Sequence, residues 1–268
     1  MYNKGSQILL TNDDGIHSPG LWSAASALAQ LGFVTVLAPR EQYSGAGRSL
    51  PTNSDGIIET KEVRVNGQVW TVYAVGGSPA QAVLHGALEI LPNKPDLVVS
   101  GINFGENLGT GITGSGTVGA AMEAAGLGIP SMAISLETSI EHHYSISDDV
   151  DFNVASHFTL MFAKKLLNQS MPEDVDLLNI NIPKEATVDT PWEITRISRI
   201  RTFESVPPTR TDWSVPARVG YRFSPDWVNA VPGTDIYALR KNKTVSVTPI
   251  SLDMTSRTNL HKFEQFLR

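Results

Sequence analysis

Two adjacent carboxylates, Asp13 and Asp14, are the residues best suited to chemistry, in an Asn-Asp-Asp-Gly stretch at residues 12–15. This stretch directly follows a short, nearly continuous apolar run at residues 7–11, which is typical of a buried parallel strand. Like charges side by side at a strand end repel each other, and a hard divalent cation such as Mg²⁺ or Mn²⁺ would offset that repulsion. A turn or a helix N-cap explains the same motif, because Asx residues before glycine are common in such loops. Both explanations stay open on this motif alone.

Two further loops are expected at the same edge of the sheet, because ligands in open α/β sheets bind beyond the carboxyl ends of the strands. The segment 39–49 is rich in small residues and carries a hydroxyl at Ser44, although a plain surface loop is the simpler interpretation of this segment alone. The segment 101–117 holds six glycines, two asparagines and several hydroxyls ahead of an expected helix. Such a loop suits backbone N–H contacts to phosphate, strengthened by the helix dipole.

The second of these loops also contains a Gly-x-Gly-x-x-Gly pattern at residues 109–114, and Glu137 follows the next strand, as in dinucleotide-binding proteins. The pattern should begin at the turn from strand to helix, whereas residues 101–108 intervene here. No lysine follows the glycines, so a nucleotide-binding P-loop is not expected either.

The elements that must position these loops alternate between strands and helices. The segment 57–75 departs from this rhythm, since two alternating runs flank Asn66-Gly67, a strong hairpin signal. Ser78 and Pro79 open a helix as N-cap and first helical residue. Strands are expected at 7–11, 33–38, 96–100, 131–135 and 177–182, and helices at 21–31, 79–91, 116–125 and 152–167.

The chain changes character after Pro183. It then carries prolines at 207, 208, 216, 225 and 232, β-like runs at 192–200, 235–239 and 244–250, and an amphipathic helix from about Asn259. We therefore expect an α/β fold of three layers, Rossmann-like, with a mostly parallel open sheet and helices on both faces. Residues 1–183 would form the core, with the hairpin at 57–75 as an insertion. Residues 184–268 would form a β-rich extension that is not an independent domain.

The composition excludes several classes of function. A formal net charge of −6 and a pI near 5.5 argue against a partner that is a nucleic-acid polymer. The absence of cysteine rules out disulfides, zinc thiolate sites and thiol catalysis, and suits a cytoplasmic location. Residues 1–6 lack the apolar core of a signal peptide, and the most apolar stretch, 119–136, is interrupted by Glu123 and Pro130. No membrane association is expected.

Taken in order, these motifs resemble the SurE family of survival-protein nucleotidases, over nearly the whole chain. The most specific matches are the Asn-Asp-Asp-Gly stretch and the Ser-Gly-Ile-Asn-x-Gly-x-Asn-Leu-Gly stretch at 100–109. The full series consists of residues 8–15 with 19–20, the loop around 44–45, and residues 76–80, 99–109, 115–121, 129–135, 179–183 and 245–250.

The resemblance implies a metal-dependent phosphatase, a phosphoric monoester hydrolase acting on nucleoside 5′- and 3′-monophosphates and, in some members, on short polyphosphate. It implies one divalent cation per subunit, Mg²⁺ or Mn²⁺, with ligands at Asp13, Asp14, Ser44 and Asn103. All four are hard oxygen donors and only two are charged, which leaves positions for water and substrate phosphate. Contacts to phosphate and substrate would come from Asn12, Gly45, Asn107, Ser115, Gly116 and Thr117.

The chemistry expected at this site is attack of a metal-oriented water on phosphorus, with Asp13 or Asp14 as base. A rival step has Asp13 as a nucleophile that forms an aspartyl-phosphate. Two departures from the family pattern, Gln42-Tyr43 before Ser44 and Gly47 where Ser or Thr is frequent, bear on substrate preference and remove no ligand.

Other polar residues have simpler explanations. His17 is assigned a structural or surface role, and His142-His143 a solvated loop. Six arginines make the C-terminal segment locally basic, which suits either ion pairs within the chain or contact with a neighbouring subunit; in the family this segment supports a homodimer or homotetramer. A non-catalytic nucleotide sensor and a dinucleotide-dependent oxidoreductase remain as alternative functions. The arginines are Arg196, Arg199, Arg201, Arg210, Arg218 and Arg222.

Overall fold

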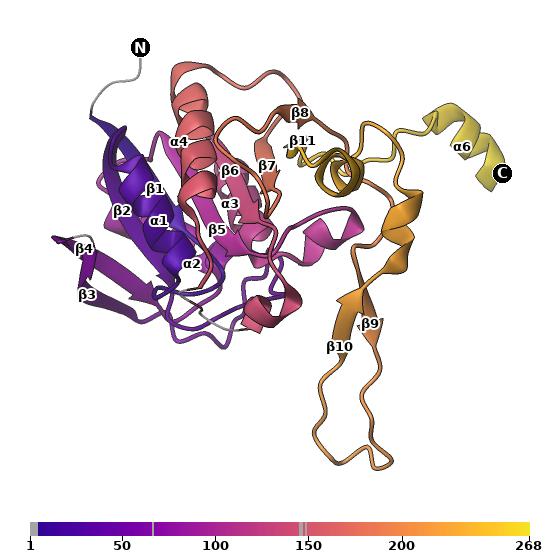
Figure 1. Ribbon diagram of the computed structural model, residues 1–268, viewed down its shortest axis with the longest axis horizontal. Helices are drawn as coiled ribbons and strands as arrows, with labels where there is room; N and C mark the ends of the chain where they lie inside the picture. Colours follow the sequence, from indigo (N-terminus) through magenta and orange to yellow (C-terminus); the bar gives the residue numbers. More distant parts are fainter. Residues whose placement is uncertain (1–4, 66, 145–146, 148) are drawn as a thin grey trace.

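The computed structural model describes residues 5–65, 67–144, 147 and 149–268, and shows a body built on one large sheet with a hairpin projecting from it (Figure 1). The sheet runs in the order β3-β4-β2-β1-β5-β6-β7-β11-β8, and β9 and β10 form a separate pair. The strands are β1 Ser6–Thr11, β2 Gly32–Pro39, β3 Ile58–Val65, β4 Gln68–Val75, β5 Leu97–Phe104, β6 Ser131–Leu136, β7 Leu177–Ile182, β8 Trp192–Ile194, β9 Phe203–Val206, β10 Gly220–Phe223 and β11 Val245–Ile250.

Strand β1 lies between β2 and β5 and is parallel to both, so the order of the chain reverses at its carboxyl end. A topological switch point therefore lies between the loops that follow β2 and β5, where open α/β sheets bind ligands. The sheet continues in parallel through β6 and β7. At its edges, β3 is antiparallel to β4, and β11 is antiparallel to β7 with β8 parallel to β11. The carboxyl ends of β1, β2 and β5 therefore meet at one edge.

Helices cover both faces of the sheet, as the apolar strands predicted. Ile8 and Leu10 of β1 pack in one apolar cluster with α1 and α4, while Leu9 packs in another with α2 and α3. Alternate residues of a strand point to opposite faces, so a strand buried on both faces needs an unbroken apolar run. The helical segments are α1 Pro19–Leu28, α2 Pro79–His85, η1 Gly86–Ile90, η2 Thr110–Gly114, α3 Gly116–Gly126, η3 Ile140–Tyr144, α4 Asn153–Asn168, η4 Pro225–Asn229, α5 Asp235–Tyr237, η5 Ala238–Asn242 and α6 Leu260–Leu267.

The expected start of α2 is confirmed in detail. Ser78 accepts a hydrogen bond from the N–H of Gln81, whose side chain returns the bond to the N–H of Ser78, and Pro79 is the first helical residue. The helix continues as the π-helical segment η1 and ends at Ile90, close to the expected boundary. No helix among the described residues has the length and apolar character that crossing a membrane requires.

Two predictions in the C-terminal segment are wrong. The run 235–239 alternates like a strand but is helical, because Asp235 accepts hydrogen bonds from the N–H groups of Gly109, Ser198 and its own successor. Ile236 and Leu239, three residues apart, then pack in one cluster. The run 192–200 keeps only the short strand β8, and the hairpin of β9 and β10 was not predicted.

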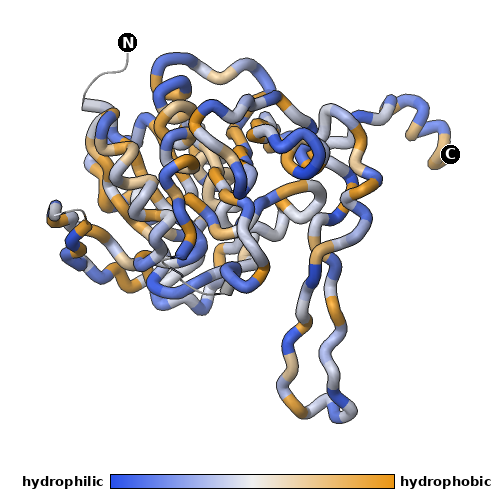
Figure 2. The backbone as a smooth tube through the Cα atoms, viewed as in Figure 1, coloured by the Kyte–Doolittle hydropathy of each residue, from blue (hydrophilic) through white to orange (hydrophobic). Residues whose placement is uncertain are grey.

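One part of the C-terminal segment belongs to the sheet, and another part projects from the body. Strands β11 and β8 form its last two strands, next to β7. The hairpin of β9 and β10 and the helix α6 project away from the body (Figure 1). Figure 2 shows apolar residues gathered in the body and only scattered along the hairpin. Two earlier expectations, the turn residue Asn66 and the first four residues of the chain, lie outside the described residues.

Candidate active site

The turn at the end of β1 is closed by Asn12. Its side-chain amide donates to the carbonyl oxygen of Gly15 over 3.0 Å and accepts from the N–H of Gly15 over 3.2 Å. Gly15 has φ of +93°, a region that only glycine adopts readily. Asn12 is completely buried, so it shapes the turn rather than lining the adjacent cavity.

Both carboxylates of this turn are buried and held by protein donors. Asp13 is 5% exposed and accepts a hydrogen bond at Oδ1 from the hydroxyl of Thr117, at the start of α3. Asp14 is 4% exposed; its Oδ2 accepts from the N–H of Phe104 over 3.2 Å, and its Oδ1 from the amide of Gln42 over 3.3 Å. The two side chains are thus fixed by three different segments, namely the loop after β2, the end of β5 and the start of α3.

The electrostatics of the pair favour a cation. Burial, and then the adjacent charge of Asp13, raise the pKa of Asp14 to about 8. Burial also raises the pKa of Asp13, although hydrogen bonds from Thr117 and from the backbone of Gly116 act in the opposite direction. Two buried carboxyls that resist ionising together are stabilised as anions when a positive charge lies between them.

The structure brings Ser44 and Asn103 to the same cavity as Asp13. The loop that carries Ser44 is tied down by a 2.7 Å hydrogen bond from the N–H of Tyr43 to the carbonyl of Asp13. The amide nitrogen of Asn103 donates to the carbonyl oxygens of Phe104 and Gly105, so this amide presents its oxygen as the remaining polar atom. A hydroxyl and an amide oxygen therefore accompany the carboxylates.

This donor set fits one hard divalent cation. Among the described residues, no group of three or more His, Cys, Asp or Glu side chains gathers in a way that could hold a metal. Mg²⁺ uses one or two carboxylates and keeps several other positions for water and substrate, so it does not need such a group. Two carboxylates with a hydroxyl and an amide oxygen match that demand.

The cavity has a volume of about 410 Å³, within the usual range of small-molecule sites. Of the residues expected to contact phosphate, the structure places Gly45, Asn107 and Ser115 in its wall. Gly116 and Thr117 do not line it; they lie behind Asp13, where the hydroxyl of Thr117 is already engaged. The glycine pattern at residues 109–114 forms the short helix η2 rather than a turn from strand to helix.

Comparison with known proteins decides the family. The family model "Survival protein SurE" matches residues 8–204. The chain belongs to the SurE family. Proteins named "5'-nucleotidase SurE" from Thermococcus gammatolerans and Methanosarcina barkeri are 42% and 41% identical to it, over 97% of this chain and 96% and 97% of theirs. The crystal structure of the SurE protein from Aquifex aeolicus superposes with a TM-score of 0.75, at 34% identity, and covers 98% of this chain and 100% of that one.

In this SurE chain, sequence reasoning missed the other wall of the cavity, which contains Glu106, His143, Arg201, Phe203 and Tyr221. The prediction that His143 lies in a solvated loop is wrong: it is 8% exposed. Its Nδ1 lies 3.1 Å from the hydroxyl of Tyr221, whose ring stacks on the imidazole. No local pattern signals this contact, because the two residues are joined only through the unpredicted hairpin.

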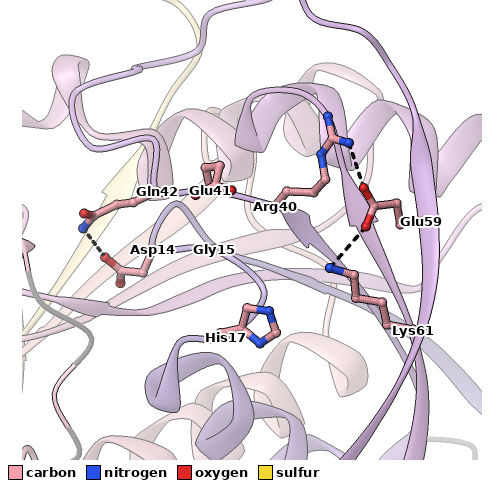
Figure 3. A pocket seen from close by; sticks show the side chains of 8 residues that line it. All are labelled: Asp14, Gly15, His17, Arg40, Glu41, Gln42, Glu59 and Lys61. Carbon is pink, nitrogen blue, oxygen red and sulfur yellow. Dashed lines mark hydrogen bonds and ion pairs between the residues drawn. The ribbon is translucent and has the colours of Figure 1, made fainter.

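A second cavity in this SurE chain, of about 680 Å³, is lined by Asp14 and Gly15 of the same turn (Figure 3). Asp14 and Gln42 are at one end, and Glu59 joins Arg40 and Lys61 through ion pairs at the other. His17 lies in its wall, so the surface role expected for this residue is consistent with its place. The positive side chains of this cavity, Arg40 and Lys61, are thus already paired with Glu59.

Proposed function

We propose that this chain is a divalent-metal-dependent phosphatase that hydrolyses nucleoside 5′-monophosphates, and nucleoside 3′-monophosphates as well. Short polyphosphate is a further candidate substrate. The observation that carries the proposal is the pair of buried carboxylates, Asp13 and Asp14, fixed at the central switch point of the sheet beside a cavity. The relatives named "5'-nucleotidase SurE" support the choice of substrate.

One divalent cation, Mg²⁺ or Mn²⁺, would be held by Asp13, Asp14, Ser44 and Asn103. When bound there, such an ion neutralises charge on the phosphate oxygens and lowers the pKa of a bound water. Each carboxylate oxygen has two lone pairs, so an oxygen that accepts one hydrogen bond, from Thr117, Gln42 or Phe104, can still coordinate a metal.

The chain's own residues would orient the carboxylates, accept a proton and contact the phosphate. Thr117 holds Asp13 in one orientation, and Asp13 or Asp14 accepts the proton of the water that attacks phosphorus in line. The phosphate would be met by Ser115 and Asn107, near the amino end of α3, whose dipole favours an anion. The rival route, in which Asp13 itself attacks phosphorus, uses the same geometry.

The test is phosphate release from AMP with Mg²⁺ or Mn²⁺, with EDTA, and after the metal is restored. We expect activity only with metal, and a loss of at least about a hundredfold in kcat for Asp14→Asn, comparable to removing one group that stabilises transition-state charge. Asp226→Asn, an exposed carboxylate away from the cavity, is the matched control and should keep full activity.

Other outcomes separate the alternatives. Near-normal activity of Asp14→Asn at saturating Mn²⁺ would contradict the metal assignment. AMP binding without phosphate release would indicate a nucleotide sensor, and NAD binding an oxidoreductase. A phosphorylated aspartate trapped during turnover would replace attack by water with attack by Asp13.

We also propose that the C-terminal segment assembles the chain into a homodimer or homotetramer. The hairpin and α6 leave large apolar side chains exposed: Trp213 is 89% exposed and Phe266 79%. Apolar residues on elements that project from the body are expected to be buried against a partner. A cytoplasmic location is proposed on the basis of the cysteine-free composition.

A further inference from the structure

Three aromatic rings from two distant segments line one part of the cavity that holds Asp13. Phe203 and Tyr221 come from the base of the hairpin, and His143 comes from η3. The rings of Phe203 and Tyr221 meet edge to face, with centroids 5.3 Å apart, and His143 stacks on Tyr221 at 6.1 Å with an interplanar angle of 28°. Together they form an aromatic wall, made of His143, Phe203 and Tyr221.

This wall belongs to the cavity rather than to a packed core. None of its members is part of the apolar clusters of the body, and Phe203 and Tyr221 stay half-buried at the point where the hairpin leaves it. Phe203 and Tyr221 pack on neighbouring rings but keep part of their own ring surface exposed beside the cavity, and a flat apolar ligand can bury that surface.

The wall is also held in place. The hydroxyl of Tyr221 lies 3.1 Å from Nδ1 of His143, and Gly109 of the glycine-rich loop forms an antiparallel bridge with Arg201, two residues before Phe203. Burial lowers the pKa of His143 to about 4, so its imidazole is neutral at physiological pH and adds no charge to the wall. Arg201 lies in the same cavity and is exposed, so its guanidinium is available to a ligand.

The cavity therefore has a polar part and an aromatic part. Asp13, Ser44 and Ser115 provide polar groups for a metal and a phosphate, while the aromatic wall provides stacking surfaces. We propose that Phe203, Tyr221 and His143 form a nucleobase subsite, which stacks the base of a nucleoside monophosphate while its phosphate reaches Asp13. This rests on the proposed function and specifies how that substrate class is recognised.

Recognition by stacking has a definite consequence for selectivity. Every base has a π-face, so stacking tolerates all of them, and its strength follows the area of the ring system. The subsite should therefore accept all four common bases, purines better than pyrimidines. It should discriminate strongly only against phosphate esters that have no base, such as ribose 5-phosphate.

The experiment compares AMP with ribose 5-phosphate in the full-length chain. Phe203→Leu keeps an apolar side chain of similar bulk in the hairpin but removes the ring, and Phe203→Trp keeps an aromatic surface. For Phe203→Leu we expect kcat/KM for AMP to fall about 5–150-fold, the range for loss of one base–aromatic stack, with ribose 5-phosphate changed less than about twofold. Phe203→Trp should retain the preference for AMP.

A binding measurement separates this proposal from the proposed function. Calorimetry in EDTA, where turnover is not expected, should show that the wild-type chain binds AMP more tightly than ribose 5-phosphate, and that Phe203→Leu loses this difference. If neither ester is hydrolysed but the difference in binding is present and depends on Phe203, the subsite stands and the phosphatase assignment fails. Equal losses for both esters, or no loss for either, would overturn the subsite.

Discussion

Arg240 pairs with two buried acidic side chains. Its removal tests how much these ion pairs contribute to the free energy of unfolding. Its guanidinium pairs with Glu106 and Glu137, whose side chains are 0% and 3% exposed, and lies over the ring of Phe223 at 5.0 Å. It thus joins η5 to the loops that follow β5 and β6. Arg240→Met keeps much of the apolar stem but leaves two buried carboxyls without their cation.

The expected loss follows from that burial. Removing one partner of a buried ion pair typically costs about 3–5 kcal/mol, because the charge left behind is uncompensated. For a chain of 268 residues, with an unfolding entropy of about 2.1 cal/mol/K per residue, this corresponds to a fall in Tm of about 5–9 °C. Thermal unfolding followed by circular dichroism, in EDTA so that metal binding does not contribute, measures it.

The loss should also depend on pH. Burial raises the pKa of Glu106 to about 7 despite the opposing charge of Arg240. A carboxyl whose folded pKa is raised stabilises the fold below its unfolded pKa, and that contribution is lost as pH rises through about 7. Without Arg240 the ionised form of Glu106 is still less favourable, so the difference in Tm between variant and wild type should be smaller near pH 5.5 than at pH 8.

A second substitution serves as the control. Glu106→Gln in the Arg240→Met background removes one of the two stranded charges and should recover part of the lost stability at pH 8, an interaction that a double-mutant cycle isolates. A shift in Tm that is the same at pH 5.5 and pH 8, or no recovery in the double variant, would refute the reasoning that the buried charges cause the loss.

Two more predictions concern the site and the assembly. Gly116→Ala would place a Cβ 2.7 Å from the Cβ of Asp13 and 2.8 Å from its Oδ2, so we expect kcat/KM for AMP to fall at least about tenfold; Gly114→Ala, where no atom lies within 4 Å of the added carbon, should keep its activity. Trp213→Ser combined with Phe266→Ser should lower the mass seen by sedimentation equilibrium, whereas a wild-type chain that sediments as a monomer would contradict the proposed assembly.

The body of the fold could be predicted because local signals and tertiary demands agree there. The run at 7–11 has three consecutive apolar residues at 8–10, as expected for a strand covered on both faces, and the structure places β1 inside the sheet, between β2 and β5. Ser78 and Pro79 marked a helix start that the structure confirms. Beyond Pro183 the signals are weaker: the alternation at 235–239 is satisfied equally by a strand or, as found, by a helix that buries Ile236 and Leu239.

The candidate site likewise contains some residues that the sequence predicted and others that it did not. Asp13 and Ser44 follow strands that one short crossover joins, so the sequence allowed them to be neighbours, whereas Asn103 was added to them through the family resemblance. The structure lines one cavity with all three. Phe203 and Tyr221 reach that cavity only because the chain returns to it after leaving the sheet, through the bridge between Gly109 and Arg201. Local sequence periodicity carries no information about a contact between residues so far apart in the sequence.

The sequence of the hairpin therefore meets two requirements, one at its base and one at its tip. At its base, Phe203 and Tyr221 must present rings to the cavity, while at its tip Trp213 is exposed to whatever the projecting segment meets. The ion pair of Glu204 with Arg222, at 2.5 Å, lies across the two strands next to these rings and fixes their register. Residues 207–219 join the tip to the ends of β9 and β10, so an assembly that holds the tip would also restrain the base of the hairpin. Loss of the assembly should therefore weaken recognition of the nucleobase more than chemistry at the phosphate. In the Trp213→Ser and Phe266→Ser variant, KM for AMP should accordingly rise while kcat for ribose 5-phosphate stays near the wild-type value; a fall in both kcat values with unchanged KM would show that the tip does not act through the aromatic wall.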